Sequence, residues 1–447
     1  MKRKLLTGLV IGGTALAIAS PAGAQEEVDP LLQVQANLDN TFVLIAAALV
    51  IFMQVGFALL ESGLTRAKNA ANIAMKNLAD FAVGALLFFA VGYALAYGGD
   101  GALIGGSNGF FLGGGIGEGY DPTDYTLTLG TDFLFQVAFA ATAATIMSGV
   151  MAERTKFVAY VIAAGLLAGI IYPIIIHWNW GGGWLSTLDT PFQDFAGSGL
   201  VHMTGGVAGL MGAIFLGARI GKYGPDGKPR AILGHNMPFA MFGTFILFVG
   251  WFGFNGGSVL AADESIGDVA LNTALAAAAG AVAATAVIWA IAKKPDVGMA
   301  CNGLLGGLVG ITASADVMSY VDAMIIGLIA GVIVVASVLG LDRLKIDDPV
   351  GAVSVHGTCG LWGLVAVGFF GELAGGSQLV TQLIGATAII GFTVVTMGAV
   401  FALLKATMGL RVSEQVEVEG LDVHEHGSPG YNLGSGDHGP MGAALTD

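Results

Sequence analysis

The chain has 447 residues, of which 55% are hydrophobic and 11% are charged, and its mean hydropathy is +0.77. This composition is typical of a polytopic helical membrane protein and excludes a soluble globular domain. The formal net charge is −14, and we expect no nucleic-acid partner.

The amino terminus has the pattern of a secretory signal peptide. Residues 2–4 are basic, residues 5–18 form an apolar run, and small residues 22–24 precede Gln25. We expect residues 1–24 to be cleaved off. The mature chain would then begin on the outer side of the membrane.

Eleven apolar stretches of the mature chain are long enough to cross a membrane as helices. They lie at about 39–63, 73–98, 129–151, 156–179, 195–218, 234–258, 268–292, 298–318, 320–341, 350–372 and 377–404. We therefore expect an all-α polytopic membrane protein with eleven transmembrane helices within 25–405, followed by a tail over 406–447. The chain's 71 glycines suit helices that approach one another closely.

The basic residues indicate the orientation. Three of the 18 Lys and Arg residues precede residue 5, and the other fifteen follow or flank alternate stretches, on one side of the predicted bundle. The intervening loops, including the glycine-rich 99–128, have none. Because basic loops stay in the cytoplasm, we expect an outer amino terminus and a cytoplasmic carboxyl terminus.

One ionisable pattern occurs twice. Asp194 is followed eight residues later by His202, and Asp348 eight residues later by His356; beyond each histidine both copies continue as His-x-Thr-x-Gly-x-x-Gly-Leu. The copies fall on the fifth and tenth stretches, so an odd offset of five helices makes them run oppositely through the bilayer. This predicts an inverted five-helix repeat whose two histidines meet near the midplane and line one pore.

A single membrane histidine is about as often a helix contact as a functional group, but duplication at matched positions favours a pore role. Asp194 and Asp348 each precede an apolar helix, and we interpret both as caps of free backbone N–H groups. Asp194, on the outer side, can also add negative potential near an external cation site.

Aromatic residues cluster on three stretches: Phe135 and Phe139 on the third, Trp180 after the fourth, and Trp251, Phe252 and Phe254 on the sixth. Most membrane aromatics are lipid anchors or core residues, so Trp180 alone is more typical of the interface belt. Its position beside three glycines and the first Asp/His helix strengthens a binding role.

Other polar residues have plainer interpretations. Asp80 lies four residues after Lys76 and can pair with it on one helix face, and Glu61 can tie helices together. Cys301 and Cys359 are expected to be packing residues. We expect no metal site, no cofactor and no enzymatic activity, because no ligand triad or nucleophile constellation lies in the apolar stretches.

Five motifs occur along the chain: FQVAFA with its AER turn, HWNWGGG, DFAGSGLVHMTGGVAGL, WFGFNGGS, and VHGTCG after DDP. Taken together, they resemble those of the Amt/Mep/Rh family of ammonium transporters, with Trp180 favouring the bacterial Amt branch. The resemblance covers nearly the whole mature chain. It implies a homotrimer in the bacterial cytoplasmic (inner) membrane, with one pore through each protomer.

The resemblance also implies roles for individual residues. Trp180, Phe139 and Ser258 match an outer site that recruits ammonium, and Phe139 with Phe254 matches a stacked phenyl gate. The pore histidines match His202 and His356, and the outer supporting aspartate matches Asp194.

These roles suit ammonium chemically. Cation–π attraction is worth about 0.5–2 kcal/mol, whereas moving an ammonium-sized ion into hydrocarbon costs several kcal/mol even after relaxation. We therefore expect deprotonation below the gate and passage of neutral ammonia beside the histidines. The proton is either relayed inward or returned outward. An ammonium sensor is the competing hypothesis, and carbon dioxide conduction is a weaker third.

The tail has five acidic residues between 414 and 425, a composition typical of a solvated disordered segment. Its LRVSEQVEVEGLDVHEHG segment nevertheless resembles the family's regulatory tail. That resemblance implies packing under neighbouring subunits and a PII-type signalling protein as a cytoplasmic partner.

Overall fold

A computed structural model describes residues 29–114, 116 and 126–431. The expected signal peptide and residues 432–447 lie outside the described residues. Within the described part, nine helices are long and apolar enough to cross a membrane, and two shorter apolar helices, Val297–Ile311 and Val353–Val367, overlap the eighth and tenth predicted stretches. The described residues form helices and no β-sheet, so the chain is an all-α polytopic membrane protein.

The α-helices are α1 (Pro30–Leu64), α2 (Ala70–Leu87), α3 (Tyr93–Tyr97), α4 (Leu129–Val150), α5 (Phe157–Leu166), α6 (Tyr172–His177), α7 (Thr204–Leu216), α8 (Met237–Trp251), α9 (Ser265–Ala292), α10 (Val297–Ile311), α11 (Tyr320–Arg343), α12 (Cys359–Val367), α13 (Gly376–Thr407), α14 (Glu414–Glu419) and α15 (Leu421–His426). The π-helical turns that begin, end or interrupt spanning helices are η2 (Phe88–Gly92), η4 (Leu167–Ile171), η5 (Ser198–Met203), η6 (Phe252–Gly256) and η7 (Val353–Thr358). Two short 3₁₀ turns are η1 (Ala67–Asn69) and η3 (Phe110–Leu112).

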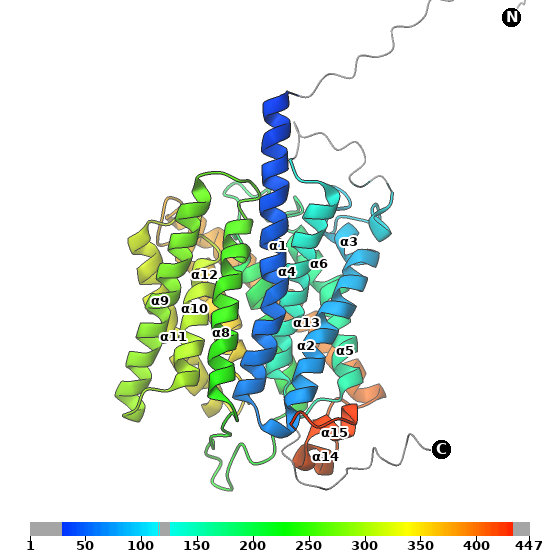
Figure 1. Cartoon of the computed structure of the whole chain (residues 1–447), viewed down its shortest axis with the longest axis vertical. Coiled ribbons are helices and arrows are strands. Elements are labelled where there is room, and N and C mark those ends of the chain that lie inside the picture. Colours follow the sequence, from blue (N-terminus) through cyan, green and yellow to red (C-terminus); the bar gives the residue numbers. More distant parts are fainter. Residues whose placement is uncertain (1–28, 115, 117–125, 432–447) are drawn as a thin grey trace, which may run out of the picture.

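Helix α1 is longer than predicted. It begins at Pro30 because the Asp29 carboxylate accepts a hydrogen bond from the Leu31 backbone N–H at 2.9 Å and proline suits the first helical turn. Its 35 residues span about 52 Å at 1.5 Å per residue, so α1 projects beyond the other helices (Figure 1). We call this the N-terminal end of the bundle, and the opposite end, where α14 and α15 lie, the tail end. At the carboxyl end of the bundle, α13 ends at Thr407.

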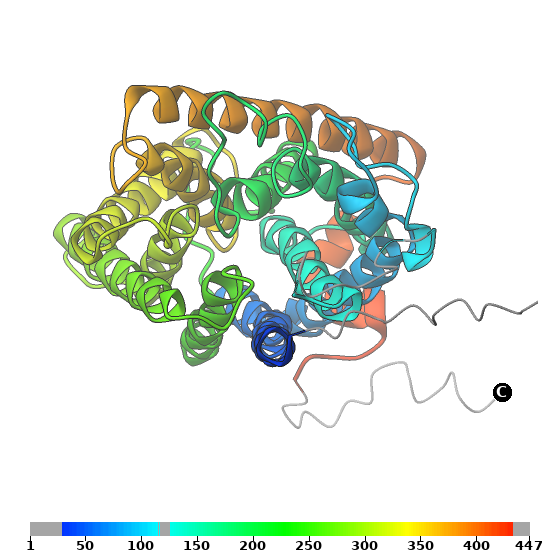
Figure 2. The same cartoon turned by 90° about the horizontal axis from the view of Figure 1, so that it is seen from above.

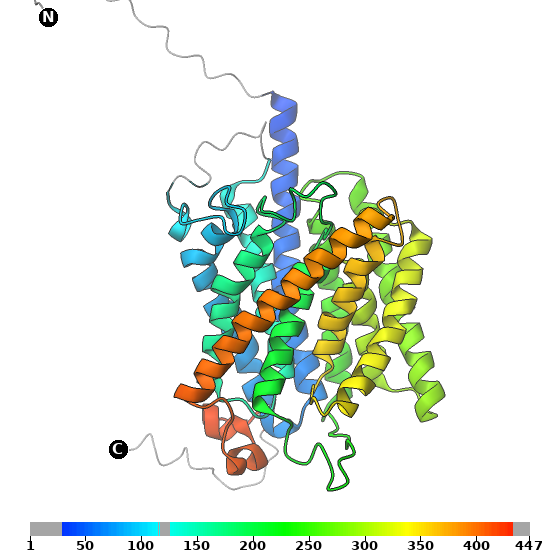
Figure 3. The same cartoon turned by 180° about the vertical axis from the view of Figure 1, so that it is seen from behind.

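The helices form two groups. In the first, α1, α2, α4 and α5 pack together; in the second, α9, α10 and α11 pack together and α8 joins them through α10. The long contact between α1 and α8 links the groups. Helix α13 runs obliquely across the face opposite α1 and packs on α7 and α12, as Figures 2 and 3 show.

The two histidine-bearing segments cross at the centre of the bundle. The turn η5 contacts α12, the turn η7 contacts α7, and η5 and η7 contact each other. A Cβ atom on Gly206 would lie 2.3 Å from the backbone nitrogen of Gly357, so this crossing requires a residue without a side chain. This reciprocal packing is what an inverted repeat predicts.

Candidate functional site

A cavity of about 490 Å³ opens at the N-terminal end of the bundle. Three of the predicted site residues, Trp180, Phe139 and Ser258, line it. Sequence reasoning missed the polar and aromatic residues that complete the lining, among them Tyr93, Tyr97, Asp132 and Gln136. The cavity therefore combines aromatic faces with several oxygen atoms, a lining suited to a small cation.

Trp180 and Ser258 are fixed by hydrogen bonds to backbone carbonyls. The indole N–H of Trp180 donates to the Asp194 carbonyl at 2.9 Å, and its ring meets the Phe139 ring edge-to-face at 5.9 Å. The Ser258 hydroxyl donates to the Phe254 carbonyl at 2.8 Å. Because that bond uses the only hydroxyl hydrogen, the Ser258 oxygen retains its lone pairs as acceptors.

Phe139 lines this cavity and packs against a second phenyl ring, that of Phe254. Phe139 on α4 and Phe254 on η6 have centroids 4.2 Å apart with planes inclined by 34°. Both are essentially completely buried. These two residues are predicted from separate stretches of the sequence, and in the structure their rings lie against each other at a tilt.

The two histidines lie directly beyond Phe254. The ring of His202 stacks on Phe254 at 5.1 Å and on Trp251 at 4.9 Å, and its Nδ1 lies 3.2 Å from Nδ1 of His356. Two neutral imidazoles can share this bond only if one carries its proton on Nδ1 and the other does not. The contact with Trp251 was missed from sequence, because that residue was grouped with the other aromatics of its stretch.

His202 has one polar atom without a partner. Its ring is fully buried, and Nε2 has no hydrogen-bond partner among the described residues. A buried nitrogen left unpaired costs about 1–3 kcal/mol, so such groups are rare in native proteins unless they serve a purpose. Phe254, His202 and His356 form a continuous column of rings that continues to Phe57, whose centroid lies 6.0 Å from that of His356.

Asp194 has the contacts that capping predicts. Its carboxylate accepts backbone N–H bonds from Gly197, Gly199 and Leu200, at 3.2, 2.9 and 2.8 Å. Burial raises the pKa of Asp194 to about 7, against the opposing effect of these N–H donors.

Asp348 repeats this arrangement at the other histidine segment. It accepts from Gly351, Ala352 and Val353 at 3.0, 3.1 and 2.8 Å. Burial raises the pKa of this carboxyl group too, and the same kind of donors oppose the rise. Each histidine segment thus begins with an aspartate that binds three backbone N–H groups.

A second cavity, of about 260 Å³, lies at the tail end. Arg219, Lys222, Asp342, Asp348 and Ser354 contribute to its lining. Its walls carry charges of both signs, in contrast to the aromatic walls at the other end. The histidine pair lies between the two cavities.

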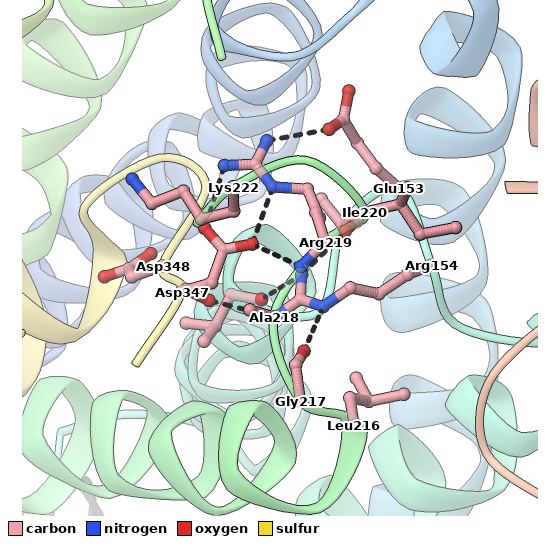
Figure 4. Close-up of polar contacts among 12 residues, drawn as sticks. Glu153, Arg154, Leu216, Gly217, Ala218, Arg219, Ile220, Lys222, Asp347 and Asp348 are labelled. Atoms are coloured by element: carbon pink, nitrogen blue, oxygen red, sulfur yellow. Dashed lines mark hydrogen bonds and ion pairs between the residues drawn. The ribbon is translucent and has the colours of Figure 1, made fainter. Parts of the chain in front are cut away.

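Arg219 forms the centre of an ion network beside this second cavity (Figure 4). Its guanidinium group binds Asp347 at 2.8 Å and Glu153 at 2.7 Å, and Arg66 binds the same glutamate at 3.0 Å. Burial alone would raise the pKa values of Glu153 and Asp347, but the arginines outweigh it and lower both to about 2. Arg154 donates to the Asp347 carbonyl at 2.9 Å.

The tail is folded against this network as far as it is described. Glu417 pairs with Arg411 at 2.8 Å and accepts a hydrogen bond from the Ile220 N–H at 2.8 Å. Asp422 accepts from the Asn72 N–H at 2.8 Å. The interpretation as a solvated disordered tail is therefore wrong for 408–431.

The predicted pairing of Lys76 with Asp80 is also not what the structure has. Asp80 accepts hydrogen bonds from Tyr160 at 2.6 Å and Thr145 at 3.0 Å, whereas the Lys76 ammonium donates to the Ser148 carbonyl at 2.9 Å. The i,i+4 spacing allowed the pair, but partners on α4 and α5 take up both side chains.

Comparison with known proteins identifies the family. The sequence profile of the Ammonium Transporter Family matches residues 41–431. The chain belongs to this family. Ammonium transporter Amt2 of Archaeoglobus fulgidus is 47% identical over 444 residues, covering 93% of this chain and 92% of that protein. Ammonium transporter Amt2 of Methanocaldococcus jannaschii is 38% identical, and the match covers 94% of this chain and 98% of that protein.

Solved structures of ammonium transporter relatives share the fold. A structure named Sensor Amt Protein superposes with a TM-score of 0.82 at 38% identity, covering 88% of this chain and 99% of that one. Mep2 from Candida albicans superposes with a TM-score of 0.78 at 29% identity, covering 87% and 89%. Both structures agree in fold with the family that the sequence comparison identifies.

Proposed function

We propose that this ammonium transporter captures ammonium in the 490 Å³ cavity at the N-terminal end, removes a proton below Phe139 and Phe254, and conducts ammonia past His202 and His356 to the tail end. The proton is relayed inward or returned. The observation that carries the proposal is the buried column of rings that runs from Phe139, in the cavity lining, through Phe254 to the two histidines.

Capture relies on Trp180, Phe139 and Ser258. A cation that rests against the indole face gains about 0.5–2 kcal/mol, and an N–H of ammonium can donate to the Ser258 oxygen. Asp194 acts through its neighbours, because its carbonyl holds the indole N–H and its carboxylate holds the start of η5.

Deprotonation provides selectivity. The cost of carrying an unpaired cation between the two phenyl rings is several kcal/mol, which neutral ammonia avoids. Potassium has no proton to lose and would bear the full cost. Beyond the rings, the unpaired Nε2 of His202 is the nitrogen that we assign to contact with the passing ammonia or its proton.

The test is uptake of labelled methylammonium by vesicles that contain His202→Ala or His356→Ala. We expect each change to lower the rate by about 100-fold, the range for loss of an acid–base group. His235→Asn is the control, because this tail-end histidine binds the Thr65 carbonyl and Tyr431 far from the column. Wild-type uptake in both alanine variants would refute the proposal.

A second candidate is an ammonium sensor, which the likeness to the structure named Sensor Amt Protein favours. A sensor without transport would bind ammonium yet give no methylammonium uptake in wild-type vesicles. Saturable methylammonium uptake by wild-type vesicles that ammonium inhibits would exclude a sensor without transport.

The assembly and the surroundings belong to the same proposal. We propose a homotrimer in a bacterial cytoplasmic membrane, with residues 1–24 removed, the N-terminal end outside, and the folded tail available to a PII-type protein. Light scattering of the purified protein tests the trimer, and amino-terminal sequencing tests the cleavage. A mature chain that begins at Met1 would contradict the signal peptide.

A further inference from the structure

Glu61 is a buried carboxylate that the proposed transport path does not yet use. It lies in the last turn of α1 and is 2% exposed. Its Oε2 accepts hydrogen bonds from the Ser148 hydroxyl at 2.8 Å and from the Asn77 amide at 3.4 Å. An ionisable residue buried between the helices of a membrane bundle is expensive and is a site hypothesis by default.

The same carboxylate shares a cavity with a pore histidine. Glu61, His356 and Asn302 are the polar residues of a small cavity whose other seven lining residues are apolar. It offers about 20 Å³ to the centre of a water molecule, enough for one water, which needs about 10–15 Å³ by this measure and two to four polar partners. Because His356 directs Nδ1 at His202, its Nε2 is the nitrogen free to meet that water.

The side chains around Glu61 set its charge. Lys76, 1% exposed, donates to the carbonyl of Ser148, the residue whose hydroxyl holds Glu61. The Lys76 ammonium also lies 4.9 Å from the centre of the Tyr160 ring, and Tyr160 donates to the buried Asp80 at 2.6 Å. The cluster therefore contains two carboxyl groups and one ammonium.

This composition favours the exchange of single protons. With one carboxyl group protonated the cluster is neutral, and with both ionised it has two carboxylates beside one ammonium and a net charge of −1. Burial disfavours larger net charges, so these two states, which differ by one proton, are the favoured ones. A single carboxylate would be enough to balance the charge of Lys76.

The small cavity also borders the tail-end cavity. Asn302 and Val350 line both, and the tail-end cavity reaches Arg219, Lys222 and Asp342 beside the folded tail. A proton that leaves Glu61 can therefore pass to water in the tail-end cavity on the Asn302 side.

We propose that Glu61 is the acceptor of the relayed proton, reached from His356 through one water in the cavity that they share. Ammonium gives a proton to Nε2 of His202 as His202 passes its Nδ1 proton to Nδ1 of His356, and His356 gives its Nε2 proton to the water. The water gives one of its own protons to the Glu61 carboxylate, and Glu61 releases a proton to the tail-end cavity. The water returns to its starting form, both histidines stay neutral but end in the opposite tautomer, and the pair resets its tautomers before the next cycle; one proton crosses per ammonia. This inference rests on the proposed function and decides between its two proton fates.

The experiment measures ammonium-evoked current and methylammonium uptake together in vesicles, and takes charge moved per molecule as the readout. For Glu61→Gln we expect this ratio to fall about tenfold or more, as for loss of a proton acceptor. Asp39→Asn is the matched control, the same change at the outer part of the same helix, where Asp39 is 1% exposed and accepts from Gln35 and the Ala262 N–H. We expect its ratio to stay at the wild-type value.

If the charge moved per molecule is unchanged in folded Glu61→Gln, whether or not current and uptake both fall, the proposal is overturned. Uptake without current in the wild-type protein would also overturn the proposal, while leaving the proposed transport function intact. The histidine variants test the transport function separately. Glu61→Asp covers the case in which the glutamine variant does not fold. Ammonium-induced infrared difference spectra should show a carboxyl band that shifts in Glu61→Asp, and a band that does not shift would contradict the assignment.

Discussion

Replacing Arg219 by methionine should destabilise the tail end more than any exposed charge change. Arg219 is 4% exposed and holds two carboxylates, Glu153 and Asp347, at 2.7 and 2.8 Å. Removing one partner of a buried ion pair costs about 3–5 kcal/mol, because an uncompensated charge stays behind. Arg66 still pairs with Glu153. The Asp347 carboxylate loses both guanidinium donors and keeps only the backbone N–H of residue 219, at 2.8 Å. We therefore expect a loss in the free energy of unfolding of about 3–5 kcal/mol.

The assay is equilibrium unfolding in mixed micelles, followed by tryptophan fluorescence. Arg230→Met is the matched control, since Arg230 is exposed and exposed charges contribute about 0–1 kcal/mol. A loss for Arg219→Met no larger than for the control would refute the view that this network stabilises the tail end.

The free energy of unfolding of the wild-type protein should fall as pH drops from about 4.5 towards 2. The folded-state pKa values of Glu153 and Asp347 are lowered to about 2, so the stability that these carboxylates contribute is lost as they protonate. An unchanged free energy of unfolding across that range would contradict their pairing with the arginines. Trp180→Leu should raise the half-saturating ammonium concentration about 2- to 30-fold, which corresponds to about 0.5–2 kcal/mol of cation–π attraction, and an unchanged value in uptake assays would remove Trp180 from capture. Gly206→Ala should cost about 1–3 kcal/mol in the same unfolding assay, because the new Cβ would lie 2.3 Å from the Gly357 nitrogen; wild-type stability would show that the crossing is not tight.

The elements that a periodic or repeated pattern specifies were predictable. The duplicated Asp/His pattern predicted that His202 and His356 approach each other, because an odd helix offset forces the two copies to cross. Apolar length predicted the positions of the nine described helices that are long enough to cross a membrane, whereas the eighth and tenth predicted stretches correspond to shorter apolar helices. The start of α1 at Pro30 was missed because residues 30–38 are too polar to count as membrane-spanning, although Asp29 and Pro30 are a recognisable helix start.

Contacts between distant segments were not predictable from one sequence. The π-helical turns that carry His202, Phe254 and His356 leave no mark in hydrophobic periodicity, since they add one residue to a turn. The pairing of Lys76 with Asp80 satisfied local spacing, yet Ser148 and Tyr160 on other helices provided the partners. Likewise, the acidic composition of the tail gave no sign that Glu417 binds Arg411 and the backbone N–H of Ile220.

The discrimination of ammonium from potassium tests the central claim most directly. Transport by deprotonation predicts that wild-type vesicles carry ammonium in the presence of excess potassium and pass no potassium current. His202→Asp should admit potassium, because a carboxylate beside His356 and Phe254 can compensate a cation that keeps its charge. A wild-type potassium current, or full selectivity in His202→Asp with normal ammonium uptake, would contradict the role of the histidine pair.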